Sequence, residues 1–174
     1  MLIRLISGLI RPTQGEVYVF GKRIGFDTSF PESLGITVEN VGFWPEYTGF
    51  DCLKTLASIK NKIGNKEIID TFERVGLDPY DKRKYYQYSL GMKQKLAIAQ
   101  AIMEKPDLIL LDEPTNSLDE ESMKAVRNIL MEERNRGALI IIASHNKEDI
   151  QLLADTNINI IEGKVYENSA VTKI

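Results

Sequence analysis

The sequence predicts an α/β fold built around a parallel sheet, and three stretches of the chain support this. Residues 107–112 and 139–144 are continuous apolar strands. Strands that are apolar on both faces belong in a parallel sheet that helices cover. Residues 119–135, which lie between these strands, form a charged amphipathic pattern that is typical of a helix. The order strand, helix, strand therefore indicates an α/β core.

The other elements follow in chain order. Apolar residues at helical spacing predict an opening helix over residues 1–10: Leu2, Leu5, Ile6, Leu9 and Ile10. Strands are expected at residues 16–20 and 34–39, a mainly helical block at 51–103, a helix at 146–154 and strands at 157–162 and 164–167. We predict a single domain over residues 1–174, with 1–50 and 104–174 as its core and 51–103 as an inserted helical subdomain.

Composition excludes several classes of protein. The net charge of -3 gives no basic field for nucleic acid, and we expect no nucleic-acid partner. The basic and aromatic stretch at 80–88 is short and is interpreted as a solvated approach to the next helix. Cys52 is the only cysteine, so no intrachain disulfide can form. The apolar runs are too short to span a bilayer, and a signal peptide is not expected.

Two adjacent carboxylates, Asp112 and Glu113, end the first apolar strand. Ligands of open α/β sheets bind outside the carboxyl ends of strands. An aspartate there can hold Mg²⁺ together with phosphate oxygens, and the next glutamate can polarise a water molecule. A lone Asp-Glu pair would be interpreted as a solvated acidic turn. The attached Pro114, Ser117 and Asp119 favour a functional site.

The stretch "LILLDEPTNSLD" at 108–119 resembles the Walker B motif and D-loop of an ATP-binding cassette (ABC) ATPase. Residues 88–114 resemble the family's signature region running into Walker B. Ser89 and Gly91 match the signature serine and its second glycine, whereas Leu90 replaces the first glycine and Met92 stands where glutamine is common. The resemblance implies a P-loop NTPase-type (RecA-like) three-layer core with an inserted α-helical signature subdomain.

The resemblance also implies the roles of the acidic pair and of one histidine. Asp112 would bind Mg²⁺, and Glu113 would act as the base for the water that attacks the phosphoryl group. His145, in "IIASHNKED", matches the family's switch histidine, which contacts the γ-phosphate. Glu113 and His145 are thus the expected catalytic residues, and ATP and Mg²⁺ are the expected cofactors.

The signature helix would complete the site of a second subunit. In the family, the serine that matches Ser89 faces the γ-phosphate held by the partner, so Ser89 and Gly91 are expected to contact nucleotide. Physically, the stretch Ser-Leu-Gly opens a helix over Lys93 to Met103, and a helix N-terminus attracts phosphate. A plain N-cap is the alternative for Ser89. Asp119 would couple the two sites.

Residues 34–50 resemble the family's Q-loop, with Glu39 where glutamine is typical. A carboxylate suits Mg²⁺, so Glu39 is expected to sense metal and nucleotide. This feature resembles cassettes of an antibiotic-resistance and bacteriocin-immunity branch. Four aromatic residues would form part of a docking surface for the permease, or two or more would close the local core: Phe43, Trp44, Tyr47 and Phe50.

The chain contains no G-x-x-x-x-G-K-[ST], the Walker A motif. By the resemblance, residues 2–17 match the helix and strand that directly follow it, so the phosphate loop would precede Met1. That loop supplies N–H groups and a lysine for the phosphates. We therefore expect the 174 residues alone to be inactive toward ATP and poorly stable, because the strands at 139–144 and 157–162 would either face an open slot or have to close up.

The function implied is the ATP-binding subunit of an ABC transporter. It would form a head-to-tail dimer with a second nucleotide-binding subunit and bind a transmembrane permease subunit. It would lie in the cytoplasm, peripherally attached to the membrane through that permease. A non-catalytic truncated cassette or interaction fragment is the alternative. A chromosome-maintenance or translation-associated ABC ATPase is disfavoured, because 174 residues hold neither a long coiled coil nor two cassettes.

Overall fold

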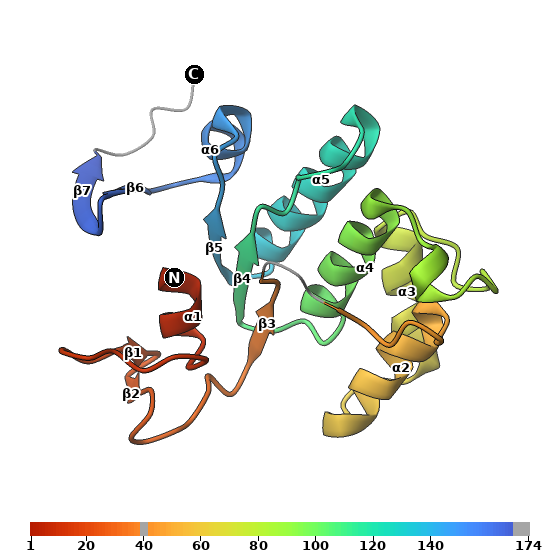
Figure 1. Ribbon diagram of the computed structural model, residues 1–174, viewed down its shortest axis with the longest axis horizontal. Helices are drawn as coiled ribbons and strands as arrows, with labels where there is room; N and C mark the ends of the chain where they lie inside the picture. The colour runs from red at the N-terminus through yellow and green to blue at the C-terminus, as the bar shows by residue number, and fades with distance from the viewer. Residues whose placement is uncertain (39–41, 169–174) are drawn as a thin grey trace. The chain divides into compact units, whose positions relative to one another are not determined.

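A computed structural model describes residues 1–38 and 42–168 of the chain (Figure 1). The chain forms two compact units, Met1–Ala143 and Ser144–Ile174. The first unit carries the parallel sheet and most of the helices, and the second carries one helix and a hairpin. None of the helices within the described ranges is long and apolar enough to cross a membrane.

The centre of the first unit is a three-stranded parallel sheet with the order β3-β4-β5. The strands are β3 (Leu34–Ile36), β4 (Leu108–Asp112) and β5 (Leu139–Ala143). In the central strand β4, the four residues before Asp112 are all buried. β5 is only half-buried, and its two end residues are exposed. β5 is therefore less covered than its continuous apolar run predicts, because among the described strands it pairs only with β4.

Helices cover both faces of this sheet, which gives the first unit three layers (Figure 1). On one face lies α1 (Leu2–Ile6), whose Ile3 packs against Leu108 and Leu110. On the other face lie α4 (Leu90–Ile102) and α5 (Glu120–Asn135). α4 approaches β3 so closely that a Cβ at Gly35 would clash with the Ala101 carbonyl oxygen, so only glycine fits there.

In its described residues, the segment between β3 and β4 contains helices and no strand. It holds α2 (Gly49–Lys60), α3 (Asn65–Arg74), the 3₁₀ turn η1 (Tyr85–Gln87) and α4. The side chains of Leu53, Ile68, Phe72 and Leu96 are fully buried in it. These helices agree with the mainly helical block predicted at residues 51–103. The domain boundaries at residues 50 and 103 stay a prediction.

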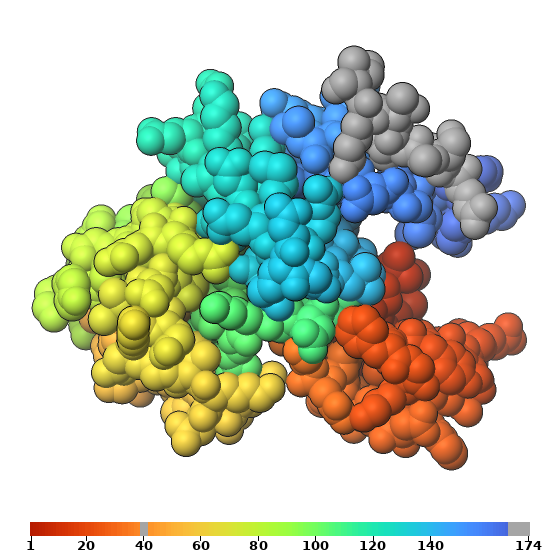
Figure 2. All heavy atoms as spheres, turned by 180° about the vertical axis from the view of Figure 1, so that it is seen from behind, coloured from red at the N-terminus to blue at the C-terminus, as the bar shows by residue number. Residues whose placement is uncertain are grey.

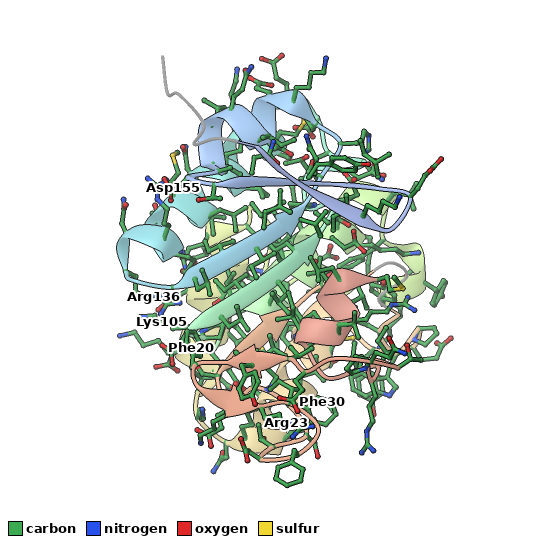
Figure 3. The ribbon with its side chains drawn as sticks, turned by 90° about the vertical axis from the view of Figure 1, so that its left-hand side faces the viewer. Phe20, Arg23, Phe30, Lys105, Arg136 and Asp155 are labelled. Atoms are coloured by element: carbon green, nitrogen blue, oxygen red, sulfur yellow. The ribbon has the colours of Figure 1, made fainter. Side chains whose placement is uncertain are left out.

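A small hairpin follows α1. Its first strand, β1 (Tyr18–Val19), lies within the strand predicted at residues 16–20. Its second strand, the antiparallel β2 (Lys22–Arg23), was not predicted from the sequence. Gly21, with a φ of 78°, makes the tight turn between them. In Figure 3, Arg23 and Phe30 lie in this region, and both Phe20 and Phe30 are more than half exposed.

The second unit consists of α6 (Lys147–Leu153) followed by the antiparallel strands β6 (Asn157–Ile161) and β7 (Lys164–Asn168). The two-residue turn Glu162-Gly163 joins the strands, and both residues have positive φ angles of 49° and 76°. Such angles define the turn type that matches the twist of a hairpin. The predicted helix, hairpin and turn agree with the structure.

Several element boundaries differ from the predictions, among them those of two helices. The opening helix ends at Ile6, not at residue 10, because Gly8 adopts a φ of 83° and lies against the backbone of Ser29. Ile3 is buried, whereas Leu2 and Leu9 are exposed. The signature helix begins at Leu90 rather than Lys93.

Candidate functional site

β4 carries Asp112 to the carboxyl end of the sheet, between two parallel neighbours. The backbone N–H of Asp112 donates to the Thr37 hydroxyl at 3.3 Å, and the Thr37 N–H donates to the Leu110 carbonyl at 2.8 Å. Thr37 is 3% exposed. This buried threonine therefore fixes the end of β4, and the Asp112 side chain is left half-buried at the edge of the sheet.

Glu113 turns the chain sharply at the end of the strand. Its φ of 47° lies in the left-handed region, which non-glycine residues seldom adopt. Its N–H donates to the Ala143 carbonyl at 2.8 Å, and its own carbonyl accepts the N–H of Asn116 at 3.1 Å. Unusual backbone angles of this kind cluster at functional sites. The alternating side-chain directions of β4 therefore end at Asp112, and Glu113 follows it in the turn.

Ser89 stands exposed at the start of α4. It is the N-cap, and its hydroxyl accepts the N–H of Met92 at 3.2 Å. The capping prediction is thus confirmed, while contact of Ser89 with nucleotide stays a prediction. Gly91 lies against the turn after β4, since a Cβ there would come within 3.1 Å of the Ser117 carbonyl oxygen.

Gln94 joins α4 to the acidic turn, a contact that the sequence analysis did not identify. Its side-chain amide donates to the carbonyl oxygens of Glu113 at 3.0 Å and Pro114 at 3.1 Å. Gly91 and Gln94 are three residues apart and so lie on one face of the helix. That spacing is the signal that could have indicated a shared partner for the two residues.

Asp119 caps α5. Its carboxylate accepts the N–H of Ser122 at 2.8 Å. The backbone N–H of Ser122, and then its hydroxyl, lower the pKa of Asp119. The carboxylate therefore stays charged and hydrogen-bonded to the first turn of α5. Its predicted role in coupling two nucleotide sites stays a prediction.

The remaining predicted residues lie elsewhere. His145 is exposed in the second unit, between β5 and Asn146, the N-cap of α6. β5 ends at Ala143, one residue earlier than predicted, so His145 is two positions beyond it. Glu39 falls outside the described residues, and its predicted role in binding metal and nucleotide stays a prediction.

Asp112 and Glu113 suit a metal ion that takes most of its ligands from phosphate oxygens and water rather than from protein side chains. Among residues 1–38 and 42–168, no group of three or more His, Cys, Asp or Glu side chains gathers to hold a metal ion. Mg²⁺, however, is usually bound by one or two carboxylates together with phosphate oxygens and water. The half-buried Asp112 at the edge of the sheet fits that pattern, whereas a structural zinc site would not.

The four aromatic residues divide into two pairs. Phe43 is buried and packs edge-on against Tyr85, with ring centroids 5.3 Å apart, while Phe50 packs against Phe72. Trp44 and Tyr47 are 42% and 43% exposed, and their ring centroids lie 5.6 Å apart. Two of the four thus belong to the local core, and two remain on the surface.

A groove of about 470 Å³ adjoins the exposed pair. It runs between the loop that carries Tyr47 and the helix α2. Its lining contains acidic, basic and hydroxyl side chains: Glu46, Tyr47, Asp51, Lys54, Thr55, Ser58 and Lys84. The groove therefore carries charges of both signs.

Comparisons with known proteins agree on one family. The sequence profile of the family described as "ABC transporter" matches residues 1–116. The chain is 46% identical over 171 residues to the ABC transporter ATP-binding protein YybJ of Bacillus subtilis, covering 98% of this chain and 78% of YybJ. It is 32% identical to the bacitracin transport ATP-binding protein BcrA of Enterococcus faecalis and 30% identical to the lantibiotic transport ATP-binding protein SrtF of Streptococcus pyogenes. It spans 56% and 70% of these two relatives.

The fold is shared with solved ATP-binding cassettes. The cassette MJ0796, in a dimeric post-hydrolysis state bound to ADP and Pi, matches with a TM-score of 0.82 at 19% identity. The match covers 95% of this chain and 78% of MJ0796. The predicted α/β fold of the P-loop NTPase type is therefore confirmed. Taken with the sequence matches, this shows that the chain belongs to the ABC transporter family.

Proposed function

We propose that this chain is the ATP-binding subunit of an ABC transporter and couples ATP hydrolysis to transport by a membrane partner. The observation that carries the proposal is the end of β4. There a buried strand delivers Asp112 and Glu113 to the edge of a parallel sheet, and the first turns of α4 contact the same turn through Gly91 and Gln94. The family match and the relatives' names support it.

Within one subunit, the acidic pair would divide the chemistry. Asp112 would hold Mg²⁺ on the triphosphate, which neutralises charge as the phosphoryl group is transferred. Glu113 would accept a proton from the attacking water. His145 would donate a hydrogen bond to the γ-phosphate, and Glu39 would sense the metal. Each of these roles needs the side chain within hydrogen-bonding reach of bound nucleotide, which a complex with ATP would reveal.

Between subunits, we propose a head-to-tail dimer. Ser89 is exposed at the start of the 13-residue helix α4, where free N–H groups and the helix dipole favour an anion. The serine of one subunit would then meet the γ-phosphate held by the other, with Gly91 allowing close approach. Asp119, which caps α5 just beyond the acidic turn, would relay changes between the two sites.

The membrane partner would bind at Trp44, Tyr47 and the adjoining groove. Exposed aromatic residues are enriched at the energetically dominant positions of interfaces. The groove offers Glu46 and Asp51 on the one hand and Lys54 and Lys84 on the other, so it suits a helical segment with charges of both signs. Through this partner the subunit would be held at the cytoplasmic face of the membrane. Similarity to bacitracin and lantibiotic transport proteins supports a peptide-antibiotic transporter.

A polypeptide of these 174 residues alone would not hydrolyse ATP. The sequence contains no phosphate-loop motif, and that loop provides the N–H groups and the lysine that hold the β- and γ-phosphates. Each lost charge-assisted hydrogen bond costs about 1.5–3 kcal/mol. The missing contacts would therefore weaken ATP binding by several powers of ten.

The decisive experiment compares this chain with an extended cassette, in which a strand and phosphate loop from another family member are joined before Met1. We expect phosphate release from ATP and Mg²⁺ only with the extended cassette. Glu113→Gln should abolish turnover there while ATP still binds. Glu121→Gln, an exposed change at the start of α5, is the matched control and should leave the rate unchanged.

Two results would contradict this proposal. Turnover by the unextended chain that disappears in Glu113→Gln would show that the 174 residues form a complete site. An extended cassette that binds ATP but hydrolyses it equally well with and without Glu113→Gln would remove Glu113 from the reaction.

A further inference from the structure

Gln94 holds the turn that presents Glu113, and this contact lies outside the roles argued above. Its Nε2 donates to the carbonyl oxygens of Glu113 at 3.0 Å and Pro114 at 3.1 Å. Both partners are carbonyl oxygens, so only the NH₂ group of the side chain can serve, and its two protons match the two acceptors. Gln94 thus spans from α4 to a backbone segment 19 residues further along the chain.

The turn needs such support, because its backbone adopts two unusual conformations. Glu113 and Ser117 have φ angles of 47° and 63°, both in the left-handed region. For non-glycine residues this conformation persists only when the surroundings fix it. Within the turn, the Asn116 N–H donates to the Glu113 carbonyl at 3.1 Å, and the Leu118 N–H donates to the Thr115 carbonyl at 3.4 Å. Gln94 therefore adds two hydrogen bonds from α4 to those that form within the turn.

α4 also approaches the same segment closely at Gly91, one helical turn before Gln94. A Cβ added at Gly91 would lie only 3.1 Å from the Ser117 carbonyl oxygen. Gln94 therefore contacts the start of the turn, at residues 113–114, and Gly91 lies against its end, at residue 117. Ser89 caps the same helix. A shift of α4 would consequently move Ser89 and the acidic turn together.

We infer that Gln94 is a positioning residue that holds the backbone of Glu113 in the conformation needed for its proposed role. The helix that presents Ser89 to a second subunit thereby also sets the place of Glu113 in its own subunit. The link to catalysis rests on the proposed function, whereas the structural part does not. Gln94 itself touches neither nucleotide nor water in this role.

Amide hydrogen exchange of the full chain tests the structural part without any nucleotide. Gln94→Met keeps the length and volume of the side chain but removes both donors. Losing these bonds should speed exchange at the amides of Asn116 and Leu118 on the order of five- to tenfold, with β4 amides unchanged. Gln94→Lys, which restores a donor of sufficient reach, should recover most of the protection. Gln100→Met, further along α4, is the control.

Three outcomes would overturn the inference. They are unchanged exchange at Asn116 and Leu118 in Gln94→Met, an equal rise there and in β4, and failure of Gln94→Lys to restore protection. If Gln94→Met does not fold, the wild-type chain still decides, because the Gln94 side-chain NH₂ protons should exchange more slowly than those of Gln151. Equal rates for both side chains would contradict the contact.

The extended cassette tests the link to catalysis. There Gln94→Met should lower kcat at least several-fold and leave the KM for ATP unchanged, because positioning of Glu113 affects the chemical step. An unchanged kcat would overturn this link. If the extended cassette shows no turnover that depends on Glu113, the proposed function fails instead, and the exchange experiment still decides the role of Gln94.

Discussion

Arg74 of α3 and Glu133 of α5 form an ion pair with 2.9 Å between Nη2 and Oε1, although they are 59 residues apart in the sequence. Glu133 is 2% exposed and also pairs with Arg136, whose guanidinium donates to the Pro106 carbonyl. Figure 2 shows the yellow atoms of the α3 region beside the cyan atoms of α5. In Figure 3, Arg136 and Lys105 lie together, at the edge of the sheet where β4 begins. This network connects α3, in the helical segment, with α5 and with Pro106 just before β4, at the end of β4 opposite Asp112.

Replacing Glu133 by glutamine should destabilise the protein substantially. The change leaves two guanidinium groups next to each other without the buried carboxylate that neutralises both. Because the arginines are partly exposed, we expect a loss of about 2–3 kcal/mol, below the range for fully buried pairs. Urea unfolding followed by fluorescence of Trp44, the only tryptophan, measures it.

The control for this prediction is Glu120→Gln. Glu120 pairs with Lys124 one helical turn along α5, but its side chain is 80% exposed. Exposed pairs of this kind contribute little to stability, because water and salt screen the two charges. Equal effects of the two glutamate substitutions would show that the buried network adds nothing to stability.

Elements whose signals are local could be predicted from the sequence. β4 is a run of apolar residues that ends in two charges, and α5 begins after an aspartate that caps it. The turn Glu162-Gly163 joins the two strands that were expected at residues 157–162 and 164–167. In each case the residue pattern and the terminating residue lie within the same short stretch, so no tertiary information was needed.

Features that depend on tertiary contacts could not be predicted. The apolar pattern predicts a helix to residue 10, but α1 ends at Ile6 because Gly8 lies against the backbone of Ser29, a contact that the local pattern does not reveal. In the candidate site, Asp112 and Glu113 stood out as a motif. Thr37 and Gln94, which hold them, reach across 75 and 19 residues, so their partners cannot be identified from the stretches in which they lie.

Alkaline pH should destabilise the chain through Cys52. The thiol is fully buried in α2, and desolvation raises its pKa from 9.0 to about 11. The folded state therefore binds the proton more tightly than the unfolded state, so stability is unaffected below pH 9 and falls as the pH rises from 9 to 11. The free energy of unfolding should decline more steeply in the wild type than in Cys52→Ala. Parallel pH profiles would contradict the burial of this thiol.

The neighbouring aromatic residues Phe43 and Trp44 should respond in opposite ways to truncation. Phe43→Ala removes a buried ring that packs on Tyr85 and should cost about 3 kcal/mol of stability. Trp44→Ala removes a ring that is 42% exposed and should cost less than about 1 kcal/mol. If Trp44 contacts the membrane partner as proposed, its substitution should instead weaken recovery of the subunit with membranes. A large loss of stability in Trp44→Ala would assign that side chain to the core.

The outer side of β5 should make a polypeptide of these residues prone to association. In the sheet order β3-β4-β5, β5 hydrogen-bonds to β4 on one side, and no other described strand pairs with it. The segment "LIIIA" carries no charge and no proline, and such edges recruit further strands. Leu139→Lys places a charge at a residue that is 50% exposed, so it should reduce aggregation measured by light scattering without loss of stability. Leu152→Lys, an equally exposed position in α6, is the matched control, and an equal reduction there would show that added charge alone improves solubility.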